Sequence, residues 1–298
     1  MRYALPVIVA AATLASAELS GQRAVLFPEG IALVFGAWVM RRADWSESRL
    51  RLVLALVLCA TCGLAAANLA PNRLLAELCA LAAAGVVLFL LPARVGPALS
   101  AAVLPTVFQI HSWLYPLSVL VIAMVVAAGL RAGEPDRDQL AGSGVVRWPG
   151  RWFGACLLIC AGWLVVVALV RLPAVAAAPP LLVSALELML GKPVAAREII
   201  VRAVFVALAW VIGALAAWRL HPEVLAGCVA VALASALLWF GRTAHAPVLA
   251  MALVPEVAGP PATWTALGLG ALAIVVAIAV LYLLGTAASR SRLTLSRE

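Results

Sequence analysis

A near-continuous succession of apolar segments, separated by short gaps that carry most of the basic residues, constrains this chain more than any other feature. Hydrophobic residues make up 66% of its 298 residues, and charged residues make up only 11%. Soluble domains carry about 25% charged residues. A chain this apolar cannot cover a globular surface with polar groups. We therefore expect an all-α membrane protein whose main partner is the lipid bilayer.

Twelve apolar segments are candidates for membrane-crossing helices. They lie near residues 4–20, 25–40, 52–70, 74–92, 95–110, 113–130, 152–170, 174–191, 199–218, 222–240, 244–258 and 262–285. A polar stretch separates the sixth segment from the seventh. The sequence thus predicts a first transmembrane repeat at 1–130, a cytoplasmic linker at 131–150, a second transmembrane repeat at 151–285 and a cytoplasmic tail at 286–298.

The basic residues between these segments predict how the chain is inserted. With a cytoplasmic amino terminus, 17 of the 21 Lys and Arg residues fall on the inner side, and the outer side receives only Arg23, Arg73, Arg171 and Arg219. This asymmetry follows the positive-inside rule for twelve spans with both termini in the cytoplasm. We expect a multi-pass protein of the plasma (inner) membrane. The net charge of +8 then reflects orientation rather than nucleic-acid binding, and Trp45 is expected to anchor the inner interface.

The two halves of the chain resemble each other at an offset of about 150 residues. Residues 63–105 align with 213–255 without a gap, which pairs Gly63 with Gly213, Pro97 with Pro247 and Pro105 with Pro255. With one residue of slippage, Pro28 pairs with Pro179. Six spans in each half predict a parallel repeat about an axis normal to the membrane. If the short proline-containing segments are re-entrant, each half loses two spans and still has an even number. Both halves then still enter the membrane from the same side, and the repeat stays parallel.

Short segments interrupted by proline at matching positions of two halves point to a binding site in transporters. Segments 95–110 and 244–258 carry Pro97 and Pro105, and Pro247 and Pro255, with the same spacing. Segments 25–40 and 174–191 open with Pro28-Glu29 and with Pro179-Pro180. Broken helices free backbone groups, and the amino-terminal ends of half-helices attract anions. Alternatively, the prolines only bend helices against neighbours with small side chains.

Glu187 and His245 are the candidate polar groups within the apolar segments. Glu187 lies deeper than the other carboxylates, and an intramembrane carboxylate often marks an ion path. It has an alternative role as the ion-pair partner of Lys192, five residues on. His245 opens the segment before Pro247, where it can titrate or act as a cap. Glu18, Glu29, Glu77, Glu223 and Glu256 are expected near the outer interface, where carboxylates stay hydrated.

Several other functional classes find no support in the sequence. The six cysteines all lie in apolar runs, so Cys59-x-x-Cys62 predicts packing rather than redox chemistry or metal binding. No nucleotide-binding, zinc or nucleophile-elbow motif occurs. We therefore expect no enzyme, no cofactor and no metal. Residues 4–20 also have the pattern of a signal peptide, but their counterpart in the repeat, 155–171, favours a retained helix.

Residues 242–253 resemble the signature of the HPP family of integral membrane proteins. The matching positions are Arg242, Thr243, His245, Pro247, Ala250, Ala252 and Leu253. Ala246 stands where the family has the first of its paired prolines, and Val95 stands where the first half would need the histidine. The resemblance implies a membrane module, and some members are linked to transport of a small anion such as nitrite. A looser likeness is to the membrane domains of fusaric acid resistance and aromatic acid exporter proteins, at Arg51 to Gly63 and at Arg202 to Gly213.

These observations lead to one main hypothesis and two alternatives. The first is a transporter or permease for a small anionic solute, whose site is lined by Pro97, Pro105, Pro247 and Pro255 with Glu187 and His245. The second is a non-transporting membrane scaffold that assembles with a partner protein or with further copies of itself. The third, an intramembrane enzyme, requires polar side chains that converge from distant helices.

Overall fold

The computed structural model describes residues 2–40, 45, 49–91, 95–132, 150–190 and 195–295, which contain helices and turns but no strand. Six helices in this part are long and apolar enough to cross a membrane. They are α4 (Arg49–Leu69), α5 (Arg73–Leu90), α9 (Gly150–Val170), α11 (Ala196–Arg219), α12 (Glu223–Phe240) and α14 (Trp264–Leu295). The prediction of an all-α membrane protein is confirmed.

Four further helical elements are much shorter. They are α2 (Pro28–Val34), which continues directly into the π-helix η3 (Phe35–Val39), α6 (Gly96–Val107), α10 (Pro179–Leu190) and α13 (Pro247–Ala258). Twelve helical residues span only about 18 Å, whereas the hydrocarbon core of a bilayer is about 30 Å thick. Each of these elements begins with a proline at its first or second position, where the missing N–H costs no hydrogen bond.

The last two α-helices in the described part are α1 (Leu5–Ser20) and α7 (Leu114–Ala132). Helices thus occur at each of the twelve predicted segments. Helix α14 continues to Leu295, ten residues past the predicted end of that span at 285. Residues 133–149 of the predicted linker and residues 296–298 of the predicted tail lie outside the described residues.

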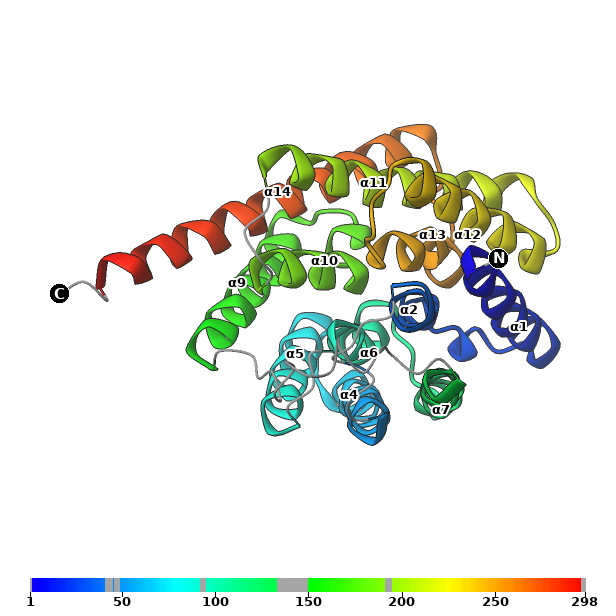
Figure 1. Ribbon diagram of the computed structural model, residues 1–298, viewed down its shortest axis with the longest axis horizontal. Helices are drawn as coiled ribbons and strands as arrows, with labels where there is room; N and C mark the ends of the chain where they lie inside the picture. Colours follow the sequence, from blue (N-terminus) through cyan, green and yellow to red (C-terminus); the bar gives the residue numbers. More distant parts are fainter. Residues whose placement is uncertain are drawn as a thin grey trace.

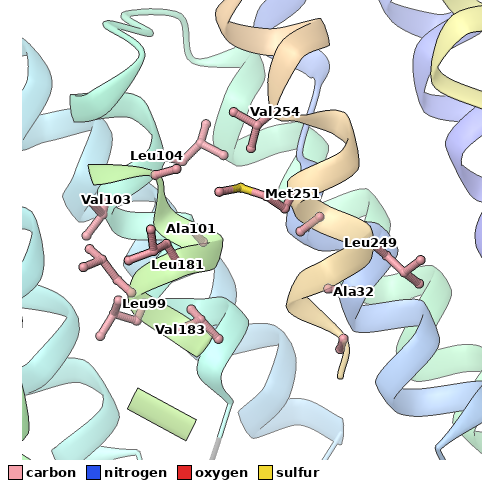
Figure 2. Close-up of a cluster of buried hydrophobic side chains, with 14 of the residues drawn as sticks. Ala32, Leu99, Ala101, Val103, Leu104, Leu181, Val183, Leu249, Met251 and Val254 are labelled. Carbon is pink, nitrogen blue, oxygen red and sulfur yellow. The ribbon is translucent and has the colours of Figure 1, made fainter. Parts of the chain in front are cut away.

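The short helices occupy the interior of the molecule, and the longer helices surround them (Figure 1). Every residue of α6 is buried, as are Pro247 to Glu256 of α13 and all residues of α10 except Glu187 and Leu190. Apolar side chains of α6, α10 and α13, including Leu104, Leu181 and Met251, fill the space between these helices (Figure 2). The shortest helices are therefore protected from lipid, which allows irregular backbone at their ends.

The helix bounds repeat with the offset that the sequence alignment has. Adding 150 to both ends of α5 gives α12, and adding 151 to both ends of the α2–η3 element gives α10. The packing follows the same relation, because α4 lies on α6 as α11 lies on α13. Helices of one half also pack on helices of the other half. Helix α2 packs on α13 and α10 on α6, while α1 packs on α12 and α9 on α5. The centre of the molecule is thus built jointly by both halves.

Two glycines permit the closest helix approaches. A Cβ on Gly63 in α4 would overlap the carbonyl oxygen of Ala102 in α6, and a Cβ on Gly213 in α11 would overlap that of Ala252 in α13. The four residues obey the offset of 150. Approaches of this kind bring a Cα–H group against a carbonyl and depend on the missing side chain.

Candidate functional site

The first turns of all four short elements line one small cavity at the centre of the molecule. Glu29 of α2, Pro97 of α6, Pro180 of α10 and Pro247 of α13 each lie within the first two residues of their helix, and all four line it. The cavity has a volume of about 10 Å³, which is about the space that one water molecule needs. The described side chains therefore leave little free space at this point.

Five polar side chains lie at or beside this cavity. Glu29, Ser100 and Glu187 line it directly, while Ser184 and His245 are each next in sequence to a lining residue, Val183 or Ala246. Glu29, Ser100, Ser184 and His245 are at most 2% exposed, and Glu187 is half-buried. Polar groups at this depth cost free energy unless they are paired or have a function.

Ser184 and His245 are paired with each other. The Ser184 hydroxyl oxygen and His245 Nε2 lie 2.6 Å apart, and they join α10 to the residue that precedes the amino-terminal cap of α13. This hydrogen bond satisfies a hydroxyl that is otherwise enclosed by apolar groups.

Glu187 points toward the amino-terminal end of α6. Its Oε1 atom lies 3.5 Å from where a Cβ on Gly96 would be, so the glycine leaves room for the carboxylate. At the corresponding position of the first half, Gly36 faces Trp45 instead, because a Cβ there would lie 2.5 Å from the indole ring. Trp45 is only 1% exposed and lines the cavity, so its predicted role as an interfacial anchor is wrong.

The amino-terminal ends of α6, α10 and α13 place partial positive charge around the cavity. Each helix is twelve residues long and has a proline at its first or second position, and the first N–H groups after these prolines bond carbonyls of the residues just before the helix. The partial charge at a helix amino terminus, about half an elementary charge, stabilises nearby anions. The carboxyl groups of Glu29 and Glu187 lie within this field.

Four of the six predicted site residues meet at the cavity. Pro97, Pro247 and Glu187 line it, and His245 lies beside it. Pro105 and Pro255 lie within α6 and α13 but outside the lining. Each is eight residues beyond the proline that does line the cavity, which corresponds to about 12 Å along the helix.

Sequence reasoning placed Glu29 wrongly. Glu29, Glu77 and Glu256 were predicted to be hydrated at the outer interface. In the structure Glu29 is only 2% exposed, Glu77 3% and Glu256 4%. The chain between α1 and α2 is a turn, a 3-10 helix and extended residues, so α2 begins inside the molecule rather than at its surface. The useful signal was the pair Pro28-Glu29 at the start of a shortened helix.

The polar groups are distributed unequally over a scaffold that repeats. His245 corresponds to Val95, and Ser100 corresponds to Ala250 at the offset of 150. Glu187 corresponds to Gly36 at the offset of 151. Sequence comparison of the halves therefore finds the helices but not the polar cluster, because no polar residue of the cluster has a polar counterpart in the other half.

Comparisons with known proteins add no further assignment. In the described part of the chain, no three His, Cys, Asp or Glu side chains are grouped as metal ligands would be. No family model, no curated protein and no solved structure matches this sequence. The likenesses to HPP proteins and to aromatic acid exporters thus stay predictions.

Proposed function

We propose that this integral membrane protein is a permease for a small anionic solute, with its binding site at the central cavity. One observation carries the proposal: the first turns of four shortened helices, two from each half, meet at one buried polar point. In transporters, helices that end inside the membrane point their dipoles at the ligand site. Three amino-terminal helix ends favour a negatively charged solute.

In this proposal all twelve helical segments cross the plasma membrane or re-enter it, both termini are cytoplasmic, and the halves form a parallel repeat. Movement of the halves against each other opens the cavity to either side in turn. Helix α2 of the first half packs on α13 of the second, and α10 of the second packs on α6 of the first. Movement of one half against the other therefore changes the lining of the cavity, which supports this mechanism.

The test is flux of nitrite and of benzoate into liposomes that contain the purified protein, with protein-free liposomes as the reference. Ala250, a fully buried residue of α13, lines the cavity, and Ala82 is an exposed residue of α5. Ala250→Leu fills a cavity that holds about one water molecule, so we expect it to abolish flux. Ala82→Leu adds the same side chain to an outward-facing surface and should leave flux unchanged. Absence of flux for every small anion tested contradicts the proposal.

A scaffold role has one observation in its favour. A mostly apolar groove of about 410 Å³ lies between α1 and α7, where the repeat would place the contact that α9 makes with α14. Its wall includes the outward-facing residues Ile8, Leu117 and Val121. A partner helix seated there would restore the missing contact. Cross-linking of a Leu117→Cys variant to one stoichiometric partner in native membranes, together with no anion flux, would favour the scaffold.

An intramembrane enzyme is less well supported by the same cluster. Ser184 and His245 have the separation of a nucleophile and its base. However, Ser184 is fully buried, and the adjoining cavity has no room for an acyl substrate. We therefore assign the pair a structural role within the permease.

A further inference from the structure

Glu29 is the least satisfied polar side chain at the central cavity. It is the second residue of α2, it is 2% exposed, and neither of its carboxyl oxygens has a hydrogen-bond partner among the described residues. The Ser100 hydroxyl lies near the carboxyl, but it too has no partner within hydrogen-bonding geometry in that part of the chain. Ser184 and His245, by contrast, pair with each other.

Among the residues that the structure describes, the groups packed around Glu29 include no Lys or Arg side chain. Helix α7 contributes Tyr115, whose hydroxyl donates to the Ala101 carbonyl, and α6 contributes Ser100. Helix α10 contributes Glu187, and α13 is preceded by His245, which pairs with Ser184. No Lys or Arg of the described chain lines the cavity. An ionised carboxylate without a counter-ion is costly at this depth, so this site suits the neutral acid.

A metal cation is a poorer occupant than a proton. The amino-terminal ends of α6, α10 and α13 carry partial positive charge, which disfavours a cation beside them. The described lining also supplies only five side-chain oxygens, from Glu29, Ser100 and Glu187, whereas Mg²⁺ and Ca²⁺ take six or more oxygen ligands. A proton needs only one carboxyl oxygen.

We propose that Glu29 carries the proton that is coupled to anion transport, so that the protein moves a proton and an anion together. The inference rests on the permease function proposed above. Ionised Glu29 and an anionic solute compete for the same partial positive charge at the helix ends. A proton taken up by the carboxylate gives the neutral acid and removes this repulsion, so that proton binding favours anion binding. By linkage, the anion then favours protonation of Glu29 by the same factor.

The first experiment measures nitrite accumulation in proteoliposomes with an acidic exterior, against a protein-free reference. The wild-type protein should accumulate nitrite above its external concentration and lose at least tenfold in flux as the external pH is raised. Glu29→Gln keeps a neutral side chain at every pH, so it should equilibrate nitrite without accumulation and show a flat pH profile. Glu256→Gln changes another buried carboxylate, which lies outside the cavity lining, and should keep the wild-type profile.

The second experiment needs no transported solute. Infrared spectra of the purified protein should contain the C=O stretching band of a neutral, buried carboxylic acid, and Glu29→Gln should remove it. Ser100→Ala removes the neighbouring hydroxyl, so it should move both this band and the midpoint of the flux profile. It serves as the test of the same site if Glu29→Gln does not fold.

The outcomes separate the two proposals. Wild-type nitrite flux with accumulation that persists in Glu29→Gln, or an acid band that Glu29→Gln and Ser100→Ala leave unchanged, overturns the proton assignment and leaves the permease intact. If no small anion is transported by the wild-type protein, the permease proposal fails and the coupling proposal fails with it. The infrared band then reports only the protonation of Glu29.

Discussion

His245 Nε2 and the Ser184 hydroxyl oxygen lie 2.6 Å apart, and this contact ties the two short helices of the second half together next to the cavity. Both residues are at most 1% exposed. Their counterparts in the first half are Val95 and Leu33, which cannot form a hydrogen bond. The second half therefore holds its short helices by a polar contact that the first half lacks.

Substitution of either partner should destabilise the protein by more than the bond itself contributes. A net contribution of about 0.5–1.5 kcal/mol is typical of a buried hydrogen bond, while an orphaned buried group costs about 1–3 kcal/mol. Ser184→Ala and His245→Ala should each lower the free energy of unfolding in detergent micelles, and the double variant should cost less than their sum.

Ser235 provides the control for this double-mutant cycle. It is a serine of α12 that is 4% exposed, and its hydroxyl has no partner in the described part of the chain. Ser235→Ala removes an unpaired hydroxyl, so it should not lower the unfolding free energy and is expected to raise it. Additive effects of Ser184→Ala and His245→Ala would show that the two side chains do not interact.

Tyr115 compensates for the proline inside α6. Pro105 has no N–H, so the carbonyl of Ala101, four residues earlier, loses its helical partner. The buried Tyr115 hydroxyl donates to that carbonyl over 2.8 Å. Tyr115→Phe should cost about 1–3 kcal/mol of unfolding free energy, because it leaves the carbonyl unpaired.

A second substitution, at Pro105, tests whether the Tyr115 hydroxyl replaces the missing N–H. Pro105→Ala restores an N–H at the right place in the helix, so Tyr115→Phe should cost less in that background than in the wild-type protein. Tyr282→Phe is the matched control, since this half-buried tyrosine has no hydrogen bond in the described chain. An equal cost in both backgrounds would mean that the hydroxyl does not replace the missing N–H.

Most of the fold follows from the sequence because lipid leaves a chain few choices. Backbone groups must be paired within each segment, so apolar runs become helices at predictable places. Gly63 with Gly213 and Pro97 with Pro247 repeat at one offset, and the structure gives both pairs equivalent positions. How many of the helices cross the bilayer stays a prediction, since hydropathy does not tell a full span from a shortened helix.

The polar cluster was only partly predictable. Glu187 and His245 stood out as single polar residues in apolar runs, but nothing local in the sequence pairs His245 with Ser184, 61 residues away. Glu29 was missed because its depth depends on tertiary packing. Hydropathy assigns it to the end of a span, whereas the irregular segment before α2 brings it to the centre.

The glycines that bring the helices together should tolerate no side chain. Gly63→Ala and Gly213→Ala each drive a methyl group into a backbone carbonyl of the facing short helix, which cannot move without displacing the cavity lining. Overpacking costs about 1–3 kcal/mol, so both variants should lose folded protein and unfold at lower temperature. Gly162→Ala in α9 and Gly268→Ala in α14 add the same methyl group to open space. If all four variants behave alike, the close approach does not limit stability.

Two ion pairs on the side predicted to be outer should respond very differently to loss of their arginine. Arg23 and Glu223 lie 2.5 Å apart, but their side chains are 58% and 43% exposed. An exposed pair of this kind contributes about 1 kcal/mol or less and is screened by salt. Arg73 bonds Glu77 over 2.7 Å, and the Glu77 side chain is only 4% exposed. Removal of Arg73 therefore leaves a nearly buried carboxylate without its cation.

Arg73→Ala should consequently lower the unfolding free energy by about 1.5–3 kcal/mol, and Arg23→Ala by much less. Glu77→Gln in the Arg73→Ala background removes the stranded charge and should recover part of the loss, while Glu223→Gln in the Arg23→Ala background should change little. Denaturation in detergent at low and high salt separates these cases, because salt screens the exposed Arg23–Glu223 pair much more than the Arg73–Glu77 pair. Equal losses for the two arginines would mean that burial of Glu77 does not set the strength of its pair.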